Sequence, residues 1–536
     1  MSTRAPLRFV LVGHFALVPL AAVVLCAVLA PRPARGQVSI GYRGHIASDA
    51  RFSLPGLLEK PDTGSHPRFL RNETEGRVRF DLRAGRHVRA LADTTLIFTG
   101  RQDAGVMSDF SIPEKVDPFR IRSEALYVRF QDLGFEGLDL TLGRLVVPWG
   151  TGDMFNPTRA LNSLDLYDPI RFGASVANQM VLLDWAPGWA VFGEKRTIFD
   201  ELMFQVALVP VFRGAILPES GLTAFTDPQY ARGRFHSELM AGLFDLQGAF
   251  IRQGGDLSYD VQVAQPDVHL RNMQVGARVG FNLLGVDLAF SYYRGFDGIP
   301  QPEAVYAEDV TLPEIRLGGG TELLELIEGI CPEGTPCLQE SLVHNRIRLV
   351  YPRIQMVGVD MATSLEFLWG AGLWAEVALV FHDDLNLQVR ESDAIVDLGG
   401  GPTVLPVGRT RHAVEVSGDV FVKAVVGMDY TITPWWYVNV QYLHGFVDEF
   451  GRAHLNDYLV AGSDFQFLSD RILLRLFTIF CLQDQSTVLY PQLTGRPWGG
   501  MELTLGGLIY LGQTDTVFGS PLTGPSMIFL RAQMNF

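Results

Sequence analysis

The stretch MIFLRAQMNF, residues 527–536, decides the fold class. Every second residue counted back from Phe536 is apolar, whereas the interleaved residues are polar over the final half of the stretch. A period of two predicts a strand with one apolar face and one wet face. The pattern fits a strand of a membrane barrel and also an antiparallel edge strand of a soluble sandwich, so the rest of the chain has to decide.

The composition favours a membrane barrel over a soluble sandwich. Of the 536 residues, 47% are hydrophobic, yet beyond the N-terminal segment no uncharged apolar run reaches the roughly 18 residues that a membrane-spanning helix needs. Glycine occurs 55 times and only 19% of the residues are charged, which fits a barrel with an apolar outer face and polar loops. The formal charge of −15 argues against a nucleic-acid partner, because such a partner requires a basic surface.

The alternation recurs along the chain. In residues 77–83 apolar side chains at even positions alternate with Arg and Asp at odd positions. An arginine facing lipid at mid-membrane would cost roughly 2–4 kcal/mol, so the charged set must face the lumen. Further strands are expected at 90–101, 121–131, 138–147, 202–208, 273–281, 286–292, 367–381, 413–430, 436–445, 455–467, 471–482 and 502–511. The sequence therefore predicts an all-β, transmembrane antiparallel β-barrel of about 16–18 strands with long extracellular or in-folded loops.

Residues 367–381 test the choice between strand and helix. As a helix, this segment would leave Glu376 in the hydrocarbon. As a strand, it places Glu376 on the inner face and a row of apolar side chains outside. We therefore expect a strand, with Glu376 in the lumen.

The chain divides into three parts. Residues 1–36 are typical of a signal peptide, with Arg4 and Arg8 before an apolar segment and Ala34-Arg35-Gly36 as the cleavage site. An uncleaved anchor is the alternative, because the apolar segment is long. Residues 37–76 lack clear periodicity and are expected to form a periplasmic lead-in or an irregular first strand. Residues 77–536 are expected to form the outer-membrane β-barrel.

Three long segments, 102–120, 151–176 and 298–345, show no strand period, and loops of this length are usually functional or disordered. In the last of them, five turn-forming residues separate Cys331 from Cys337, which predicts a disulfide in an oxidising compartment. Residues 322–330 have the spacing of a short amphipathic helix. A metal site would need more ligands than the cysteine pair supplies, so neither a metal nor a cofactor is expected.

The least generic stretch is GRLVVPWG, residues 143–150, followed by an Asn-Pro turn at 156–157. The apolar parity changes near Gly143, and a bulge there would turn Arg144 into the lumen. Arg144 would then contact solute, or it would pair with Asp153 or Asp165 and fix the loop inside the barrel. The candidates for the lumen or a constriction are Arg144, Trp149, Asp153, Asn156, Asp165, Asp168 and Glu376. The Asn and Asp residues among them are equally expected in plain turns.

This stretch resembles a family of large porin-like outer-membrane proteins of Gram-negative bacteria with no assigned activity. In that family a Gly-Arg-Gln strand leads to Trp-Gly and then to an Asn-Pro turn, whereas this chain has Leu145 at the Gln position. The ending on Phe536 resembles the terminal strand that the outer-membrane assembly machinery recognises in bacterial barrels. The resemblance implies transport or channel activity in the outer membrane. It also implies contact with outer-membrane lipid and lipopolysaccharide. Periplasmic or inner-membrane proteins are further transport partners that are compatible with it.

Three functions remain open at this point. The first is a channel or transporter for small or amphipathic solutes. The second is a plugged component of a lipid or polysaccharide export pathway, which differs in needing partner proteins. The third is an outer-membrane hydrolase, for which His382-Asp383-Asp384 is the one suggestive cluster. A Gly-x-Ser-x-Gly element is missing, so the sequence does not predict an enzyme.

Overall fold

The computed structural model describes residues 38–54, 68–101, 107–187, 199–218, 235–252, 254–312, 341–391, 394–397, 402–405, 410–520 and 523–536. The expected signal peptide, the amphipathic helix at 322–330 and the Cys331–Cys337 pair lie outside these residues.

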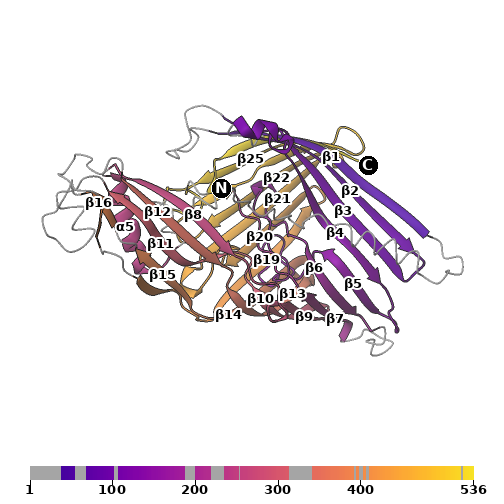
Figure 1. Ribbon diagram of the computed structural model, residues 1–536. Helices are drawn as coiled ribbons and strands as arrows, with labels where there is room; N and C mark the ends of the chain where they lie inside the picture. Colours follow the sequence, from indigo (N-terminus) through magenta and orange to yellow (C-terminus); the bar gives the residue numbers. More distant parts are fainter. Residues whose placement is uncertain are drawn as a thin grey trace.

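The described strands close into one antiparallel barrel (Figure 1). Its strands are β1 (Val38–Ser53), β2 (Phe69–Ala84), β3 (Val88–Thr99), β4 (Phe119–Phe130), β5 (Leu138–Leu145), β6 (Asn178–Trp185), β7 (Phe199–Val209), β9 (Gln274–Leu283), β10 (Val286–Phe296), β13 (Arg353–Leu365), β14 (Ala371–His382), β19 (Phe421–Thr433), β20 (Trp436–His444), β21 (Asp457–Phe467), β22 (Ile472–Cys481), β23 (Thr487–Leu489), β24 (Gln492–Gly495), β25 (Met501–Leu511) and β26 (Met527–Asn535). Because β23 and β24 both lie between β22 and β25 in one register, they count as one strand. The described barrel thus has 18 strands, which confirms the predicted fold class.

The stretch MIFLRAQMNF closes this barrel. β26 pairs with β25 on one side and with β1 on the other, and Phe536 and Gly44 exchange two backbone hydrogen bonds of 2.9 Å. Leu530 and Met534 are more than half exposed on the outside, whereas Arg531 binds Glu75 within the lumen. The period of two in the last ten residues is therefore the alternation between lipid face and lumen face.

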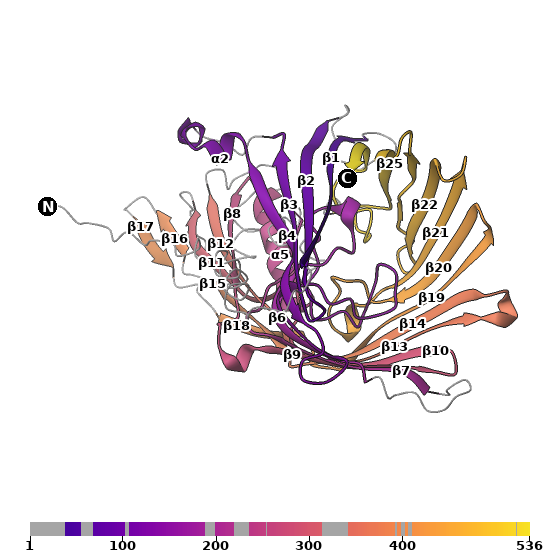
Figure 2. The same cartoon turned by 90° about the vertical axis from the view of Figure 1, so that its right-hand side faces the viewer.

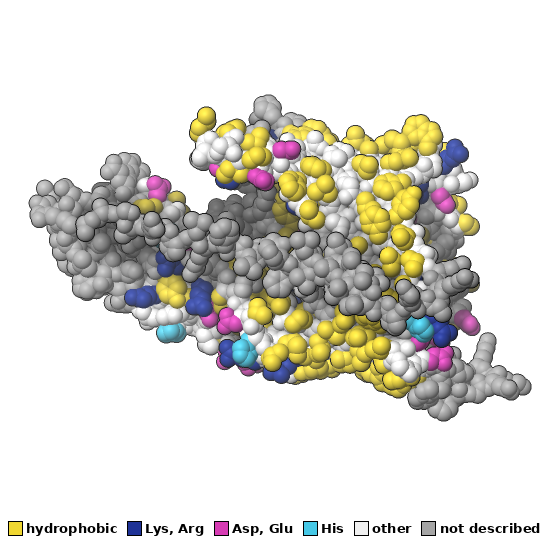
Figure 3. Space-filling view, turned by 45° about the vertical axis from the view of Figure 1, so that its right-hand side comes forward, with side chains coloured by type: hydrophobic (Ala, Val, Ile, Leu, Met, Phe, Trp, Pro, Cys, Tyr) yellow, Lys and Arg dark blue, Asp and Glu magenta, His cyan; other side chains and the backbone are white. Residues whose placement is uncertain are grey.

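The same alternation runs through the wall. Phe80 on β2 is exposed, and the neighbouring Arg77 and Arg79 lie beside Asp93 of β3. Figure 3 shows hydrophobic side chains spread over the described outer surface of the strands. Among the described residues, no helix is both long and apolar enough to cross a bilayer.

Residues 37–76 differ from the expected lead-in or irregular first strand. They contain β1, a strand of 16 residues, and the beginning of β2. Val38, Ile40 and Tyr42 point outward, but Gly44 and Ala50 follow on the same face. The small residues hide the alternation in the sequence, although the backbone pairing continues through them.

The connections β5–β6, β7–β9, β10–β13 and β14–β19 lie at one end of the barrel, which we call the loop end. The opposite end, called the turn end, holds the start of β1, the end of β26 and the short turns of hairpins such as β9–β10 and β19–β20. Outer-membrane barrels distribute their extracellular loops and periplasmic turns in this way.

A second sheet projects from the loop end (Figures 1 and 2). Three connections, between β7 and β9, β10 and β13, and β14 and β19, supply its seven described strands. These are β8 (Asp256–Ala264), β11 (Gln301–Leu312), β12 (Leu342–Val350), β15 (Leu385–Glu391), β16 (Ala394–Asp397), β17 (Pro402–Leu405) and β18 (Thr410–Val416). Helix α5 (Glu238–Arg252) packs on this sheet through Met240, Leu243 and Phe244. The sequence prediction treated 298–345 as a loop and 413–430 as one strand, and both were wrong.

The other described helices are short. They are η1 (Met107–Ser111), α2 (Pro113–Val116), η2 (Pro169–Arg171), η3 (Leu270–Asn272), η4 (Glu366–Leu368) and η5 (Arg452–His454). Because η4 and the left-handed Trp369 occupy the start of the expected strand 367–381, β14 begins only at Ala371.

Replacing Leu505 by arginine tests the assignment of the outer face. Leu505 lies in the middle of β25 and is 54% exposed on the outside, so Leu505→Arg is expected to lower the folding free energy by roughly 2–4 kcal/mol. Thr504→Arg is the matched control on the lumen face and should cost less than half as much. Urea titration of folding into phospholipid vesicles measures both. Equal losses would contradict the register.

Candidate functional site

The connection between β5 and β6, residues 146–177, folds back into the barrel, and we call it the inner loop (Figure 2). Its side chains and backbone bond to β1, β2, β7 and β14 and to Tyr490 beside β24. Because these partners are spread around the ring of strands, the inner loop crosses the lumen. A porin with an open channel of this strand number would leave that space to water.

Glu376 holds the beginning of the inner loop. Its carboxylate is fully buried and accepts hydrogen bonds from the backbone N–H groups of Thr151 (2.5 Å), Gly152 and Thr158 (3.4 Å) and from the Thr158 hydroxyl (3.0 Å). A buried carboxylate without such donors would be strongly destabilising. The predicted lumen position of Glu376 is thus occupied by the loop.

The Trp-Gly pair of the motif makes this contact sterically feasible. Gly150 has a φ of +94°, and a Cβ atom there would lie 2.6 Å from both carboxylate oxygens of Glu376. Trp149 is 1% exposed, and its Nε1 donates a 3.0 Å hydrogen bond to Gln205 Oε1 on β7. Trp149 therefore fixes the loop to β7, and Gly150 lets the backbone turn toward Glu376 on β14.

Two asparagines shape the loop from within. Asn162 Oδ1 accepts a hydrogen bond from Val147 N, and its Nδ2 donates to the carbonyl oxygens of Leu145 and Val176. Asn156 Nδ2 donates to the carbonyl oxygen of Trp149 at 3.3 Å. Both side chains thus stabilise the conformation of the loop, which is the structural role that the sequence analysis gave as an alternative for them.

The far end of the inner loop is anchored by charge. Asp168 is 5% exposed and accepts hydrogen bonds of 2.7 and 2.9 Å from the guanidinium of Arg51 on β1. Arg171, three residues later, pairs with Glu75 on β2, which also binds Arg531. Burial alone would raise the pKa of Asp168, but the hydrogen bonds and charge of Arg51 outweigh burial and lower it to about 2.

Contrary to the sequence prediction, Arg144 neither faces the lumen nor pairs with Asp153 or Asp165. The register of β5 is unbroken through Gly143, so no bulge occurs there, and the register shift lies in neighbouring β4. Arg144 is opposite the exposed Gln179, and alternation puts it on the outer face near the loop end. The partner of Asp165 is Arg122, with 3.6 Å between Nη1 and Oδ2, and Asp153 lines a cavity together with Arg171 and Arg475.

The parity change near Gly143 has another cause. Leu145, Val147 and Trp149 face inward and are buried against the wall, so they continue the lumen face rather than a bulged lipid face. Gly143 itself has a φ of +135°, and a Cβ there would lie 2.4 Å from the carbonyl oxygen of Leu126. Leu145, Val147 and Trp149 are apolar because they pack against other apolar side chains inside the barrel, and not because they face lipid.

The inner face of the wall changes character along the barrel axis. From the turn end to the loop end, the side chains on the inner face are Gln466, Asp464, Val460 and Tyr458 on β21, Leu473, Arg475, Phe477, Ile479 and Cys481 on β22, and Glu502, Thr504, Leu508 and Tyr510 on β25. Apart from Leu473, the turn half of this wall is polar, and its loop half is apolar. Barrels that hold water throughout have a polar interior instead.

Two cavities follow this division. The apolar cavity, about 250 Å³, lies in the loop half, where Phe172 of the inner loop faces Phe446, Ile479, Leu508 and Tyr510. The polar chamber, about 540 Å³, lies nearer the turn end. Its charged lining consists of Asp153, Arg171, Asp464, Arg475 and Arg531.

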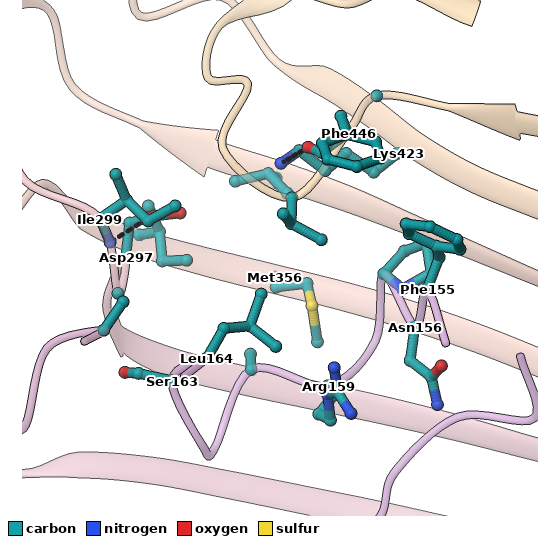
Figure 4. A pocket seen from close by; sticks show the side chains of 18 of the residues that line it. Phe155, Asn156, Arg159, Ser163, Leu164, Asp297, Ile299, Met356, Lys423 and Phe446 are labelled. Carbon is teal, nitrogen blue, oxygen red and sulfur yellow. Dashed lines mark hydrogen bonds between the residues drawn. The ribbon is translucent and has the colours of Figure 1, made fainter. Parts of the chain in front are cut away.

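A smaller cavity of about 130 Å³ lies between the inner loop and β13 and β19 (Figure 4). Arg159, Lys423 and Asp297 line it, and the sequence analysis singled out none of them. Lys423 Nζ donates to the carbonyl oxygen of Phe446 at 2.8 Å, and Asp297 accepts from the backbone N–H of Ile299 at 2.8 Å. Since both groups are engaged with the backbone, they stabilise the loops there.

The chamber residues Arg475, Arg531 and Asp464 were not among the site residues expected from the sequence. All three lie on the polar face of strands that the sequence did predict, and this position could have identified them as lumen residues. Among the described residues, no group of three or more His, Cys, Asp or Glu side chains could hold a metal ion. In the His382 cluster, the ring Nδ1 lies 2.8 Å from the carbonyl oxygen of Asp383, and Asp384 accepts from Gly418 N.

Replacing Glu376 by glutamine tests the anchor. One amide oxygen cannot serve the four donors that the carboxylate serves, so Glu376→Gln should cost roughly 2–4 kcal/mol of folding free energy. It should also expose the inner loop to trypsin at Arg159. The control is Glu366→Gln in the exposed turn before β14. Urea midpoints and cleavage rates that match the control would refute the anchor.

The second anchor predicts a pH dependence. Since the pKa of Asp168 is lower in the folded state than in the unfolded chain, its stabilisation is complete above about pH 4 and is lost as the pH falls toward 2. The full loss, below pH 2, should be about 2–3 kcal/mol, of which about 1.5 kcal/mol is lost by pH 2.5, and Asp168→Asn should remove this part of the acid dependence. Urea unfolding at pH 6 and pH 2.5 measures the effect, with the exposed Asp287→Asn as control. An unchanged acid dependence in Asp168→Asn would contradict the prediction.

Comparison with known proteins assigns the chain to a family. No curated protein matches the chain. Among solved structures, OmpF of Salmonella typhi in complex with daunomycin has a TM-score of 0.36 and 9% identity over 93% of this chain and 97% of that chain. The outer membrane channel DcaP of Acinetobacter baumannii has a TM-score of 0.32 and 9% identity over 94% and 98%. The family described as "Protein of unknown function (DUF1302)" matches residues 61–468, and the chain belongs to that family.

Proposed function

We propose that the protein is an outer-membrane channel or transporter for amphipathic solutes, which cross an obstructed barrel rather than an open aqueous pore. The observation that carries this proposal is the change of the lumen wall from polar to apolar along its axis, with a cavity in each half. An apolar cavity with a few polar groups nearby is the usual form of a small-molecule site.

The proposed location rests on the barrel surface. Apolar side chains such as Val440 (52% exposed) and Leu505 (54% exposed) cover the middle of the strands. The connections that carry the inner loop and the second sheet lie at one end, and the start of β1 and the end of β26 lie at the other, as in outer-membrane barrels. The short turns would then face the periplasm, and the second sheet with α5 would face the exterior.

Passage into vesicles tests the proposal. Proteoliposomes with wild-type protein should take up octyl glucoside faster than protein-free vesicles do, and should take up the hydrophilic sugar arabinose little faster. Leu508→Trp should reduce the uptake of octyl glucoside about tenfold, because the larger side chain fills the apolar cavity. The matched control is Leu505→Trp, which lies on the outer face of the same strand.

Each alternative has its own outcome. Fast arabinose uptake would indicate an open pore and contradict the obstructed barrel. Octyl glucoside uptake no faster than in protein-free vesicles would contradict the channel, and would favour an export component that needs partner proteins.

A further inference from the structure

The apolar cavity and the polar chamber adjoin each other. Met154, Phe477 and Tyr490 line both of them. The Tyr490 hydroxyl donates a 3.2 Å hydrogen bond to the carbonyl oxygen of Ile170 in the inner loop. Tyr490 therefore lies, together with Phe477 and Met154, at the boundary between an apolar and a charged space, and one hydrogen bond holds its hydroxyl group.

The lining of the chamber contains more cationic than anionic side chains. Three arginines, at 171, 475 and 531, line it with two aspartates, at 153 and 464. Asp464 is already bound, because Arg475 Nε and Nη2 donate to its two oxygens at 2.8 and 2.5 Å.

The arginines retain unused donors. Arg531 donates one 2.6 Å hydrogen bond to Glu75 and one of 3.1 Å to Gln533, and Arg171 also donates to Glu75. A guanidinium carries five N–H donors, so these contacts use only part of the capacity of each arginine. Donors on several arginines around one space can bind the oxygens of a carboxylate, sulfonate or phosphate.

We infer that the solute of the proposed channel is an amphipathic anion, an inference that rests on the proposed function. Its alkyl part occupies the apolar cavity, and its anionic head group binds Arg475 and Arg171 in the polar chamber. Tyr490 separates the two parts of the path and moves aside when a solute passes. A cationic head group would meet three arginines, and the carboxylates of Asp464 and Glu75 are already bound by these arginines.

Three solutes with one tail and different head groups test the inference. Uptake of octane-1-sulfonate, octyltrimethylammonium and octyl glucoside is measured in proteoliposomes of one lipid composition. Wild-type protein should pass the sulfonate about tenfold faster than the cation, with the glucoside between them. Arg475→Gln should abolish most of this preference, and Arg475→Lys should retain part of it because the charge remains.

The control variant is Arg496→Gln, because Arg496 lies in the turn after β24 and pairs with Glu502 at 3.0 Å. Heat-modifiable migration on a gel verifies that each variant has folded. A second variant, Tyr490→Ala, should speed the passage of all three solutes and leave their order unchanged.

The outcomes separate the two claims. If the three solutes pass wild-type protein equally fast, or if the cation passes fastest, the anion inference is overturned and the channel remains. A sulfonate preference that survives in Arg475→Gln also overturns the role of the chamber. If none of the solutes passes faster than through protein-free vesicles, both the proposed function and the inference fail.

Discussion

The structure of the lumen depends on one buried carboxylate. Glu376 lies in the middle of β14 with no exposed surface, and the donors around it come from residues 151–158 of the inner loop. In a medium of low dielectric constant, a carboxylate without these donors would be far more costly than in water. The wall and the loop therefore stabilise each other, and the glycines at 150 and 152 are the residues that allow the approach.

The division of the interior follows from that contact. Once the loop crosses the lumen, apolar wall residues such as Ile479 and Leu508 have a partner to pack against, and they can face inward without meeting water. Toward the turn end the inner loop contributes Asp153 and Arg171, which line the polar chamber together with inward wall residues such as Arg475. The same chain segment thus occupies part of the lumen and forms one side of the apolar cavity on which the proposed function rests.

Much of the barrel could be predicted from the sequence, because lipid enforces a period of two wherever one face is apolar, as in residues 77–83 and 527–536. Glu376 was placed correctly by the same reasoning. The rule failed at Leu145 and Trp149, because it assumed that apolar faces meet lipid, whereas these residues face an apolar interior. The second sheet combines three distant connections, and the partner of Asp165 depends on the register of β4, so neither has a local signal.

The most direct test of the account is hydrogen–deuterium exchange across residues 146–160 in lipid. Loop amides normally exchange quickly, but here the N–H groups of Thr151, Gly152 and Thr158 donate to a fully buried carboxylate. The account predicts that this peptide exchanges as slowly as a wall strand such as β14 and becomes fast in Glu376→Gln. Exchange in the wild-type protein as fast as in the exposed turn 468–471 would contradict it.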